Sequence, residues 1–247
     1  MSKTFEALQK AEKEKIPLNT KRPNKNNKTS LTNFNLDVRI IEELKNMKFY
    51  IRSISDQKLI RTILFTSSNP GEGTSTILVN FAKEIAASGE KVIIIDTNLR
   101  NPILHKLLNV ENIEGVAEAI DKRKPLIETI KKTATENLRI ITHGKQSEGT
   151  LAGFSSDTMK PIINELKSHA DWILFDSPPI HQYSDAAVLA NEVDGVIMVV
   201  QAEKTKWEVA QSARDKIKKE NTQILGAILN KKQFHIPNLI YKLFINR

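Results

Sequence analysis

Six short runs of apolar, mostly β-branched residues constrain the fold of this chain more than any other feature. Helical stretches separate each run from the next. The runs are residues 62–66, 91–96, 138–142, 171–176, 195–201 and 224–230, and the helical stretches are 76–88, 102–108, 114–132, 156–169, 183–191 and 205–220. Strands without polar alternation are covered on both faces, and strands joined through helices run parallel. We therefore expect an α/β fold with a mostly parallel central sheet and helices on both faces.

The segments outside these runs differ in composition and suggest four parts. Phe5, Leu8 and Ala11 lie at helical spacing, which predicts a short amphipathic helix over residues 1–16. Residues 17–36, rich in Asn, Lys and Thr, predict a basic flexible linker before an α/β domain over 37–232. Residues 233–247 mix basic and apolar side chains, so we expect an amphipathic tail that either packs on the domain or lies on a membrane surface.

Positive charge is concentrated at the start of the chain. Residues 1–33 hold eight basic and three acidic residues and so carry +5 of the total net charge of +8. Such an arm is either a solvated tether or a contact for anionic lipid, nucleic acid or an acidic protein. The chain has no cysteine, no apolar run of about 18 residues and no signal-peptide pattern. We therefore expect a cytoplasmic protein.

The first apolar run leads into a glycine-rich turn with the anatomy of a phosphate-binding loop. Gly71 and Gly73 let the backbone curl so that successive N–H groups point inward, and Ser75 offers a hydroxyl to Mg²⁺. The helix that begins near Thr76 directs its positive end to the same place. A strand, turn and helix of this kind either binds phosphate or has a purely structural role. Residues elsewhere in the chain are needed to distinguish the two.

The loop departs from the usual pattern G-x-x-x-x-G-K-[ST] at two positions. Ser68 stands where the first glycine is expected, and Thr74 stands where the lysine is expected. The predicted anion cradle therefore lacks its usual full positive charge. A hydrogen bond to a charged group contributes about 1.5–3 kcal/mol, so nucleotide affinity falls by about 10- to 150-fold without it. Phosphoryl transfer suffers more, by about 10³-fold, because charge grows on the transferred group.

Two of the apolar runs end in an aspartate, Asp96 and Asp176. The carboxyl ends of parallel strands meet at one edge of a sheet, which is where ligands bind. A single strand-end aspartate is often only a turn or cap residue. Two of them beside a phosphate loop suit a phosphate-bound Mg²⁺, one to hold the ion and one to orient the attacking group. We therefore predict a metal site of Ser75, Asp96 and Asp176, with both aspartates catalytic.

A further amphipathic helix is expected over residues 37–54, before the first strand. Its broad apolar face holds Ile40, Ile41, Leu44, Met47 and Ile51. Three charged residues, Glu42, Lys45 and Lys48, follow one another at intervals of three. They either pair within the helix or reach another subunit.

Several motifs together resemble one family. They include Pro70-Gly-Glu-Gly-x-Ser-Thr76, Ile95-Asp-x-x-Leu-Arg-x-Pro-x-x-His105, Asp176-Ser-Pro-Pro179 and Gly226-Ala-Ile-Leu-Asn230. From residue 42 to about residue 230 the chain resembles the cytoplasmic bacterial tyrosine kinases (BY-kinases) of capsule and exopolysaccharide systems. That family belongs to the same P-loop NTPase class as the partition and cell-division ATPases.

The resemblance implies ATP or ADP with Mg²⁺ as cofactors and Arg100 as a third catalytic residue beside the two aspartates. The nucleotide-binding residues it implies are Gly71, Glu72, Gly73, Thr74, Ser75, Thr76 and Asn230. Glu42, Lys45 and Lys48 resemble the family's Glu-x-x-Arg-x-x-Arg pattern for self-association, which implies a homo-oligomer. A membrane-embedded chain-length regulator is the implied activating partner. The protein would then be cytoplasmic and recruited to the inner face of the membrane, with peripheral contact to anionic lipid and without nucleic acid.

The chain also departs from the BY-kinase pattern in ways that leave its function open. Asn98 replaces a second acid, and Tyr50, Tyr183 and Tyr241 are the only tyrosines, so we expect no autophosphorylation of a Tyr-rich tail. Arg100 or a lysine of a neighbouring subunit would have to replace the missing loop lysine. Three functions stay under consideration: a tyrosine kinase acting on another protein, a catalytically impaired assembly subunit that senses nucleotide, and a positioning ATPase of the partition type.

Overall fold

The computed structural model describes residues 38–54, 59–121, 123–145 and 155–232. The predicted N-terminal helix, the basic linker and the C-terminal tail lie outside the described residues. Residues 146–154 also lie outside them.

The described domain is built on a seven-stranded sheet with the strand order β3-β4-β2-β5-β1-β6-β7. The strands are β1 (Thr62–Ser67), β2 (Val92–Asp96), β3 (Lys131–Lys132), β4 (Leu138–Ile141), β5 (Trp172–Asp176), β6 (Gly195–Gln201) and β7 (Ile224–Asn230). All neighbouring pairs are parallel except β3 with β4. The prediction of a mostly parallel sheet is confirmed, and the two-residue edge strand β3 is added to the six expected strands.

The helices are α2 (Val38–Ser53), α3 (Thr74–Ala87), α4 (Leu104–Leu107), α5 (Val116–Ile120), α6 (Ser156–Leu166), α7 (Ser184–Glu192) and α8 (Trp207–Lys219), with a 3₁₀ turn η1 (Leu126–Thr129). The expectation of one helix over 114–132 is wrong, because that stretch forms α5, η1 and β3. Pro125 explains the break. Its ring removes a backbone N–H and disfavours helical geometry at the residue before it.

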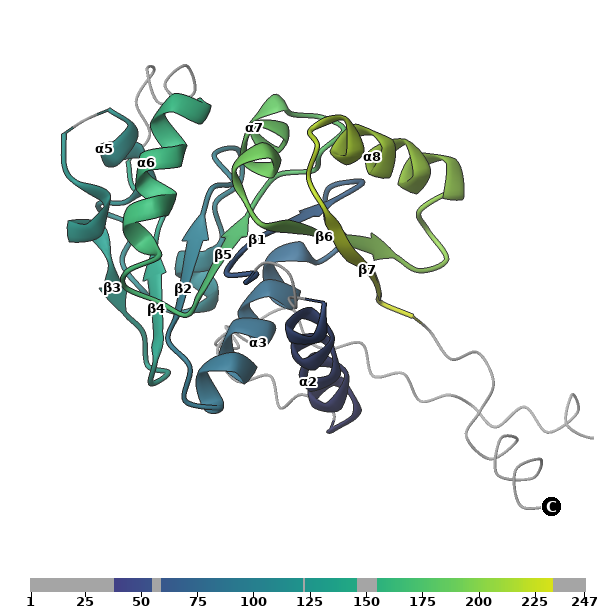
Figure 1. Cartoon of the computed structure of the whole chain (residues 1–247), viewed down its shortest axis with the longest axis horizontal. Helices are drawn as coiled ribbons and strands as arrows, with labels where there is room; N and C mark the ends of the chain where they lie inside the picture. The colour runs from purple at the N-terminus through teal and green to yellow at the C-terminus, as the bar shows by residue number, and fades with distance from the viewer. Residues whose placement is uncertain (1–37, 55–58, 122, 146–154, 233–247) are drawn as a thin grey trace, which may run out of the picture. The chain divides into compact units, whose positions relative to one another are not determined.

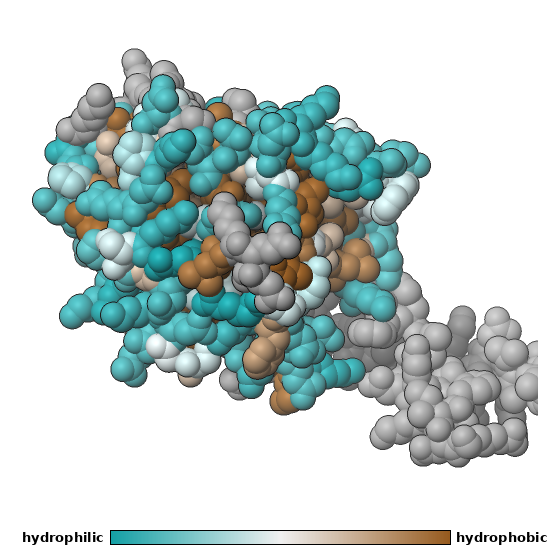
Figure 2. Space-filling view, in the orientation of Figure 1, coloured by the Kyte–Doolittle hydropathy of each residue, from teal (hydrophilic) through white to brown (hydrophobic). Residues whose placement is uncertain are grey.

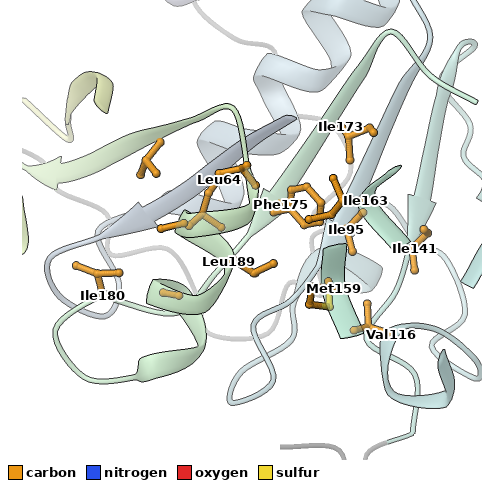
Figure 3. Packing of buried hydrophobic residues seen from close by; sticks show 14 of the residues in the cluster. Leu64, Ile95, Val116, Ile141, Met159, Ile163, Ile173, Phe175, Ile180 and Leu189 are labelled. Atoms are coloured by element: carbon orange, nitrogen blue, oxygen red, sulfur yellow. The ribbon is translucent and has the colours of Figure 1, made fainter. Parts of the chain in front are cut away.

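Helices cover both faces of the sheet, as expected (Figure 1). Adjacent residues of β1 show this, because Leu64 belongs to one buried cluster and Phe65 to the other. Side chains from α5, α6, α7 and α8 complete the first cluster, and side chains from α2, α3 and α4 complete the second. Figure 3 shows Leu64, Phe175 and Ile95 of the strands beside Met159, Ile163 and Leu189 of the helices. The polar residues at the carboxyl ends of the strands, such as Asp96 and Asp176, belong to neither apolar cluster.

Helix α2 packs against α3 through part of its predicted apolar face. Leu44 and Ile51 are buried, whereas Ile40 is 44% exposed. On the face of the molecule shown in Figure 2, hydrophilic residues cover most of the surface and hydrophobic residues gather near the middle. Within the described ranges, no helix has the length and apolar character needed to cross a membrane.

Candidate functional site

The predicted phosphate loop is a curled turn between β1 and α3. Gly71 and Gly73 have φ angles of 78° and 97°, in the left-handed region that favours glycine. Helix α3 begins at Thr74, two residues before the expected start. The first N–H groups of a helix have no partner within it, so those of α3 are left for a ligand at this turn.

A buried carboxylate holds the loop in this shape. Oε2 of Glu72 accepts hydrogen bonds from the backbone N–H groups of Ser68 at 2.8 Å and Asn69 at 3.1 Å. The hydroxyl of Thr205 donates to the other oxygen, Oε1. Glu72 was expected to bind nucleotide, but its side chain contacts the loop itself. A direct role for Glu72 at the nucleotide stays a prediction.

The two strand-end aspartates lie side by side beneath the loop. Asp96 of β2 and Asp176 of β5 are register partners in adjacent parallel strands, and both are fully buried. The hydroxyl of Ser75 donates to Oδ2 of Asp176 at 2.6 Å. Oxygens of Asp96 accept the N–H groups of Asn98 at 3.3 Å and Leu104 at 3.1 Å, so this aspartate also shapes the segment after β2. The structure therefore brings together Ser75, Asp96 and Asp176, as the sequence predicted.

Burial changes the acidity of both aspartates. It raises the pKa of Asp96 to about 7. Burial and the nearby charge of Asp96 raise the pKa of Asp176 well above its ordinary value. Two carboxyl groups in this position favour a cation between them or a proton on one of them.

An unsatisfied oxygen indicates where a cation fits. Oδ1 of Asp176 is buried and has no hydrogen-bond partner among the described residues. Buried polar atoms normally have partners, and Mg²⁺ prefers oxygen ligands. In the described ranges no group of three or more His, Cys, Asp or Glu side chains would hold a metal ion alone. The residues therefore fit a Mg²⁺ ion that keeps water and phosphate oxygens among its ligands.

A cavity of about 370 Å³ lies at the loop, lined in part by Gly73, Thr74, Ser75 and Thr76. Residues after three strands complete it, among them Arg100 after β2, Ser177 after β5 and Lys231 after β7. The guanidinium carbon of Arg100 lies 4.8 Å from the ring centroid of Tyr183, which also lines the cavity. Arg100 is therefore placed at the site where it was expected.

The end of β7 contacts the loop backbone. The side-chain amide of Asn230 donates to the carbonyl of Glu72 at 2.8 Å, and Nζ of Lys231 donates to the carbonyl of Gly71 at 2.6 Å. Asn230 was expected to bind nucleotide, and the described contact is with the loop. Sequence reasoning missed Lys231, whose only signal is its place directly after the last strand.

The residues expected to mediate self-association make contacts within the chain. Nζ of Lys45 lies 3.8 Å from Glu84, and Nζ of Lys48 lies 2.5 Å from Glu90. Both lysines thus join α2 to α3 and the segment after it, instead of pairing within α2. Glu42 is exposed. Self-association through these three residues stays a prediction.

Comparison with known proteins places the chain in a family. A family model described as "ParA: NUBPL iron-transfer P-loop NTPase" matches residues 58–245. The tyrosine-protein kinase YwqD of Bacillus subtilis (strain 168) is 31% identical over 192 residues, which are 78% of this chain and 81% of that protein. The chain belongs to the BY-kinase family of P-loop NTPases.

Two further BY-kinase relatives agree with this assignment. The putative tyrosine-protein kinase CapB of Staphylococcus aureus is 31% identical over 78% of this chain and 84% of its own length. The crystal structure of the chimerical protein CapA2B2 superposes with a TM-score of 0.73 at 25% identity, covering 78% of this chain and 85% of that one. The resemblance seen in the motifs and the expected fold class are therefore confirmed. Membership of the P-loop NTPases implies nucleotide binding.

Proposed function

We propose that this BY-kinase homologue binds Mg-ATP and Mg-ADP at the phosphate loop and uses the site for phosphoryl transfer. The observation that carries the proposal is the buried, register-paired Asp96 and Asp176 with Ser75 bonded to one of them. The loop N–H groups would hold the phosphates, and Ser75 with the aspartates would hold Mg²⁺. The ion would neutralise charge on the transferred phosphoryl group. The partly hydrogen-bonded Asp96 would orient the attacking hydroxyl.

The proposed reaction is ATP-dependent tyrosine phosphorylation of a protein other than this chain's own tail. Kinase names among the relatives support it, and the motif resemblance to capsule and exopolysaccharide kinases suggests that it regulates polymer synthesis and export. The test combines the purified full chain with Mg-ATP and its membrane partner, and measures phosphotyrosine on every component by mass spectrometry. Asp96→Asn should abolish the signal. No phosphotyrosine on any component would end this proposal.

A second function is favoured by two residues at the same site. Thr74 lines the cavity where a lysine is expected, and Asn98 replaces a second acid. The chain would then be a nucleotide-sensing assembly subunit that regulates polymer length by associating and dissociating, without catalysis. ATP turnover separates the two functions: steady release of ADP by the unmodified protein would exclude the non-catalytic subunit. A positioning ATPase of the partition type is the weaker alternative, and DNA binding by the full chain would favour it.

The proposed partner is a membrane-embedded chain-length regulator that recruits the protein to the inner face of the cytoplasmic membrane. The solved relative CapA2B2 is a chimera, which supports pairing with a second protein. The basic residues 1–33 would add contact with anionic lipid. Sedimentation with vesicles made with and without anionic lipid tests the lipid contact.

A further inference from the structure

The last strand of the sheet brings a lysine to the phosphate loop. Lys231 follows β7 directly, and its Nζ donates to the carbonyl of Gly71 at 2.6 Å. Lys231 also lines the cavity that Thr74 and Ser75 line. A side-chain cation therefore lies at the loop whose own lysine is replaced by Thr74.

The backbone of Lys231 is held in an unusual conformation. Its φ angle is 56°, in the left-handed region that residues other than glycine seldom adopt. Its N–H donates to Oδ1 of Asn230 at 2.8 Å, while Nδ2 of the same asparagine donates to the carbonyl of Glu72 at 2.8 Å. One asparagine side chain thus ties the turn after β7 to the loop. A strained conformation persists only where its surroundings hold it.

The contact between this turn and the loop is close. A Cβ atom added to Gly73 would lie 2.2 Å from Nδ2 of Asn230, so no larger residue fits there without a shift. The position of Lys231 relative to the loop is therefore fixed by packing. Its side chain keeps freedom, because Lys231 is exposed and a lysine stem is flexible.

We propose that Lys231 supplies, from the same chain, the positive charge that the loop lacks at Thr74. Its ammonium group would turn from the Gly71 carbonyl to the phosphate oxygens of a nucleoside diphosphate or triphosphate in the cavity. An ammonium group has three N–H donors, and its contact with the described residues uses one of them. This inference rests on the proposed binding of nucleotide at the loop, and it requires no second subunit to complete the site.

Calorimetric titration of the full chain with Mg-ADP tests this role of Lys231. Lys231→Gln should weaken binding by about 10- to 150-fold, the range for a hydrogen bond to a charged group. Lys232→Gln removes the same charge one residue further on and should change affinity by less than about 2-fold, since Lys231 lines the cavity and Lys232 is not among the described residues that line it. The difference between the two variants should shrink as salt is raised, because the Lys231 ammonium is exposed.

A role of Lys231 in holding the loop must be separated from a role in neutralising phosphate. Thr74→Lys introduced together with Lys231→Gln restores a charge at the loop but not the bond to the Gly71 carbonyl. It should recover affinity to within about 10-fold of the unmodified protein. Recovery identifies the charge as the cause. Failure to recover, with a lower melting temperature for Lys231→Gln without nucleotide, would assign Lys231 a structural role and overturn the inference.

The remaining outcomes are also decisive. If the unmodified protein binds Mg-ADP and Lys231→Gln binds equally well, the inference is wrong and the proposed function stands. The same holds if Lys232→Gln loses as much affinity, or if only Arg100→Gln does, because Arg100 is the other cation among the described residues that line the cavity. If the unmodified protein does not bind Mg-ADP at all, both the proposed function and the inference fail.

Discussion

At the scale of single residues, negative charge on the buried carboxyl group of Asp176 is unfavourable, and a bound cation would stabilise it. One of its oxygens accepts the Ser75 hydroxyl, and the other is buried without a partner among the described residues. The neighbouring Asp96 is also fully buried. Without a cation, burial disfavours charge on both groups. A protein keeps such a pair when binding of a ligand satisfies it.

Asp176→Asn should therefore separate stability from metal binding. We expect the free energy of unfolding of the unliganded variant to be about 1–2 kcal/mol higher at pH 8. The substitution removes a buried carboxyl group that lies next to the carboxyl group of Asp96. We expect Mg²⁺ to lose its effect on ADP affinity in the same variant. Urea unfolding and titrations with and without Mg²⁺ measure the two quantities. Asp171→Asn is the control, since the exposed Asp171 carboxylate accepts the backbone N–H of Lys91 at 2.8 Å and does not line the cavity among the described residues. An unchanged Mg²⁺ effect in Asp176→Asn would remove this aspartate from the metal site.

At the scale of elements, the loop between β1 and α3 depends on its contact with the end of β7. Gly71 and Gly73 share positive φ angles, but only Gly73 packs against Asn230. A Cβ at Gly71 would meet nothing within 4 Å. The two glycines therefore differ in packing while they share backbone strain.

Alanine substitutions can measure this difference. Gly71→Ala should cost about 1–2 kcal/mol of unfolding free energy from left-handed strain alone. Gly73→Ala should cost at least ~1 kcal/mol more, because the Asn230 side chain or the loop must move. Chemical unfolding of both variants gives the comparison. Equal costs would show that the loop and the end of β7 are not packed as described.

Helix α2 is fastened to the domain by the carboxylate of Glu90. Nε1 of Trp172 donates to Glu90 at 2.7 Å, and Lys48 and Arg52 of α2 lie 2.5 Å and 2.6 Å from it. Burial alone would raise the pKa of Glu90, but the hydrogen bonds from Lys48, Trp172 and Arg52 outweigh it and lower the pKa to about 2. This carboxylate joins a helix to the sheet.

The stabilisation by Glu90 should depend on pH with a definite sign. The pKa of the folded state lies below the ordinary value of 4.5, so the stabilisation is present above pH 4.5 and is lost as the pH falls toward 2. Glu90→Gln should lower the unfolding free energy by about 1–3 kcal/mol at pH 7, and by progressively less below pH 4.5. Denaturant unfolding across this range measures it. Glu84→Gln, whose Lys45 partner is 3.8 Å away, should cost under ~0.5 kcal/mol. A pH-independent loss would contradict the assignment.

At the scale of the whole molecule, the question is whether the outer face of α2 joins copies of the chain. Glu42 is exposed, whereas Lys48 is bonded to Glu90 within the chain. We expect Glu42→Ala to weaken self-association with little change in stability, and Lys48→Ala to lower the unfolding free energy by about 1 kcal/mol. Sedimentation velocity and urea unfolding distinguish the two effects. Glu43→Ala, an exposed neighbour, is the control. If Glu42→Ala and Glu43→Ala sediment alike, the predicted role of Glu42 is wrong.

The amino-acid sequence by itself determined the sheet, its helical cover and the place of the loop. Strands made of continuous apolar residues are stable when both faces of the sheet are buried. The polar residues that follow such parallel strands then lie at the same edge of the sheet. Asp96, Asp176 and Ser75 could be brought together by this reasoning because each is fixed by the strand or helix beside it. Gly71 and Gly73 predicted the loop, because only glycine adopts the backbone angles of this turn at low cost.

Tertiary structure alone decided which partner each side chain takes. Glu72 turns into its own loop, Lys48 bonds to Glu90, and Lys231 reaches Gly71 across a sequence separation of 160 residues. Periodicity reports which face of an element is apolar. It carries no information on contacts between the ends of distant elements, which depend on how the chain packs in three dimensions.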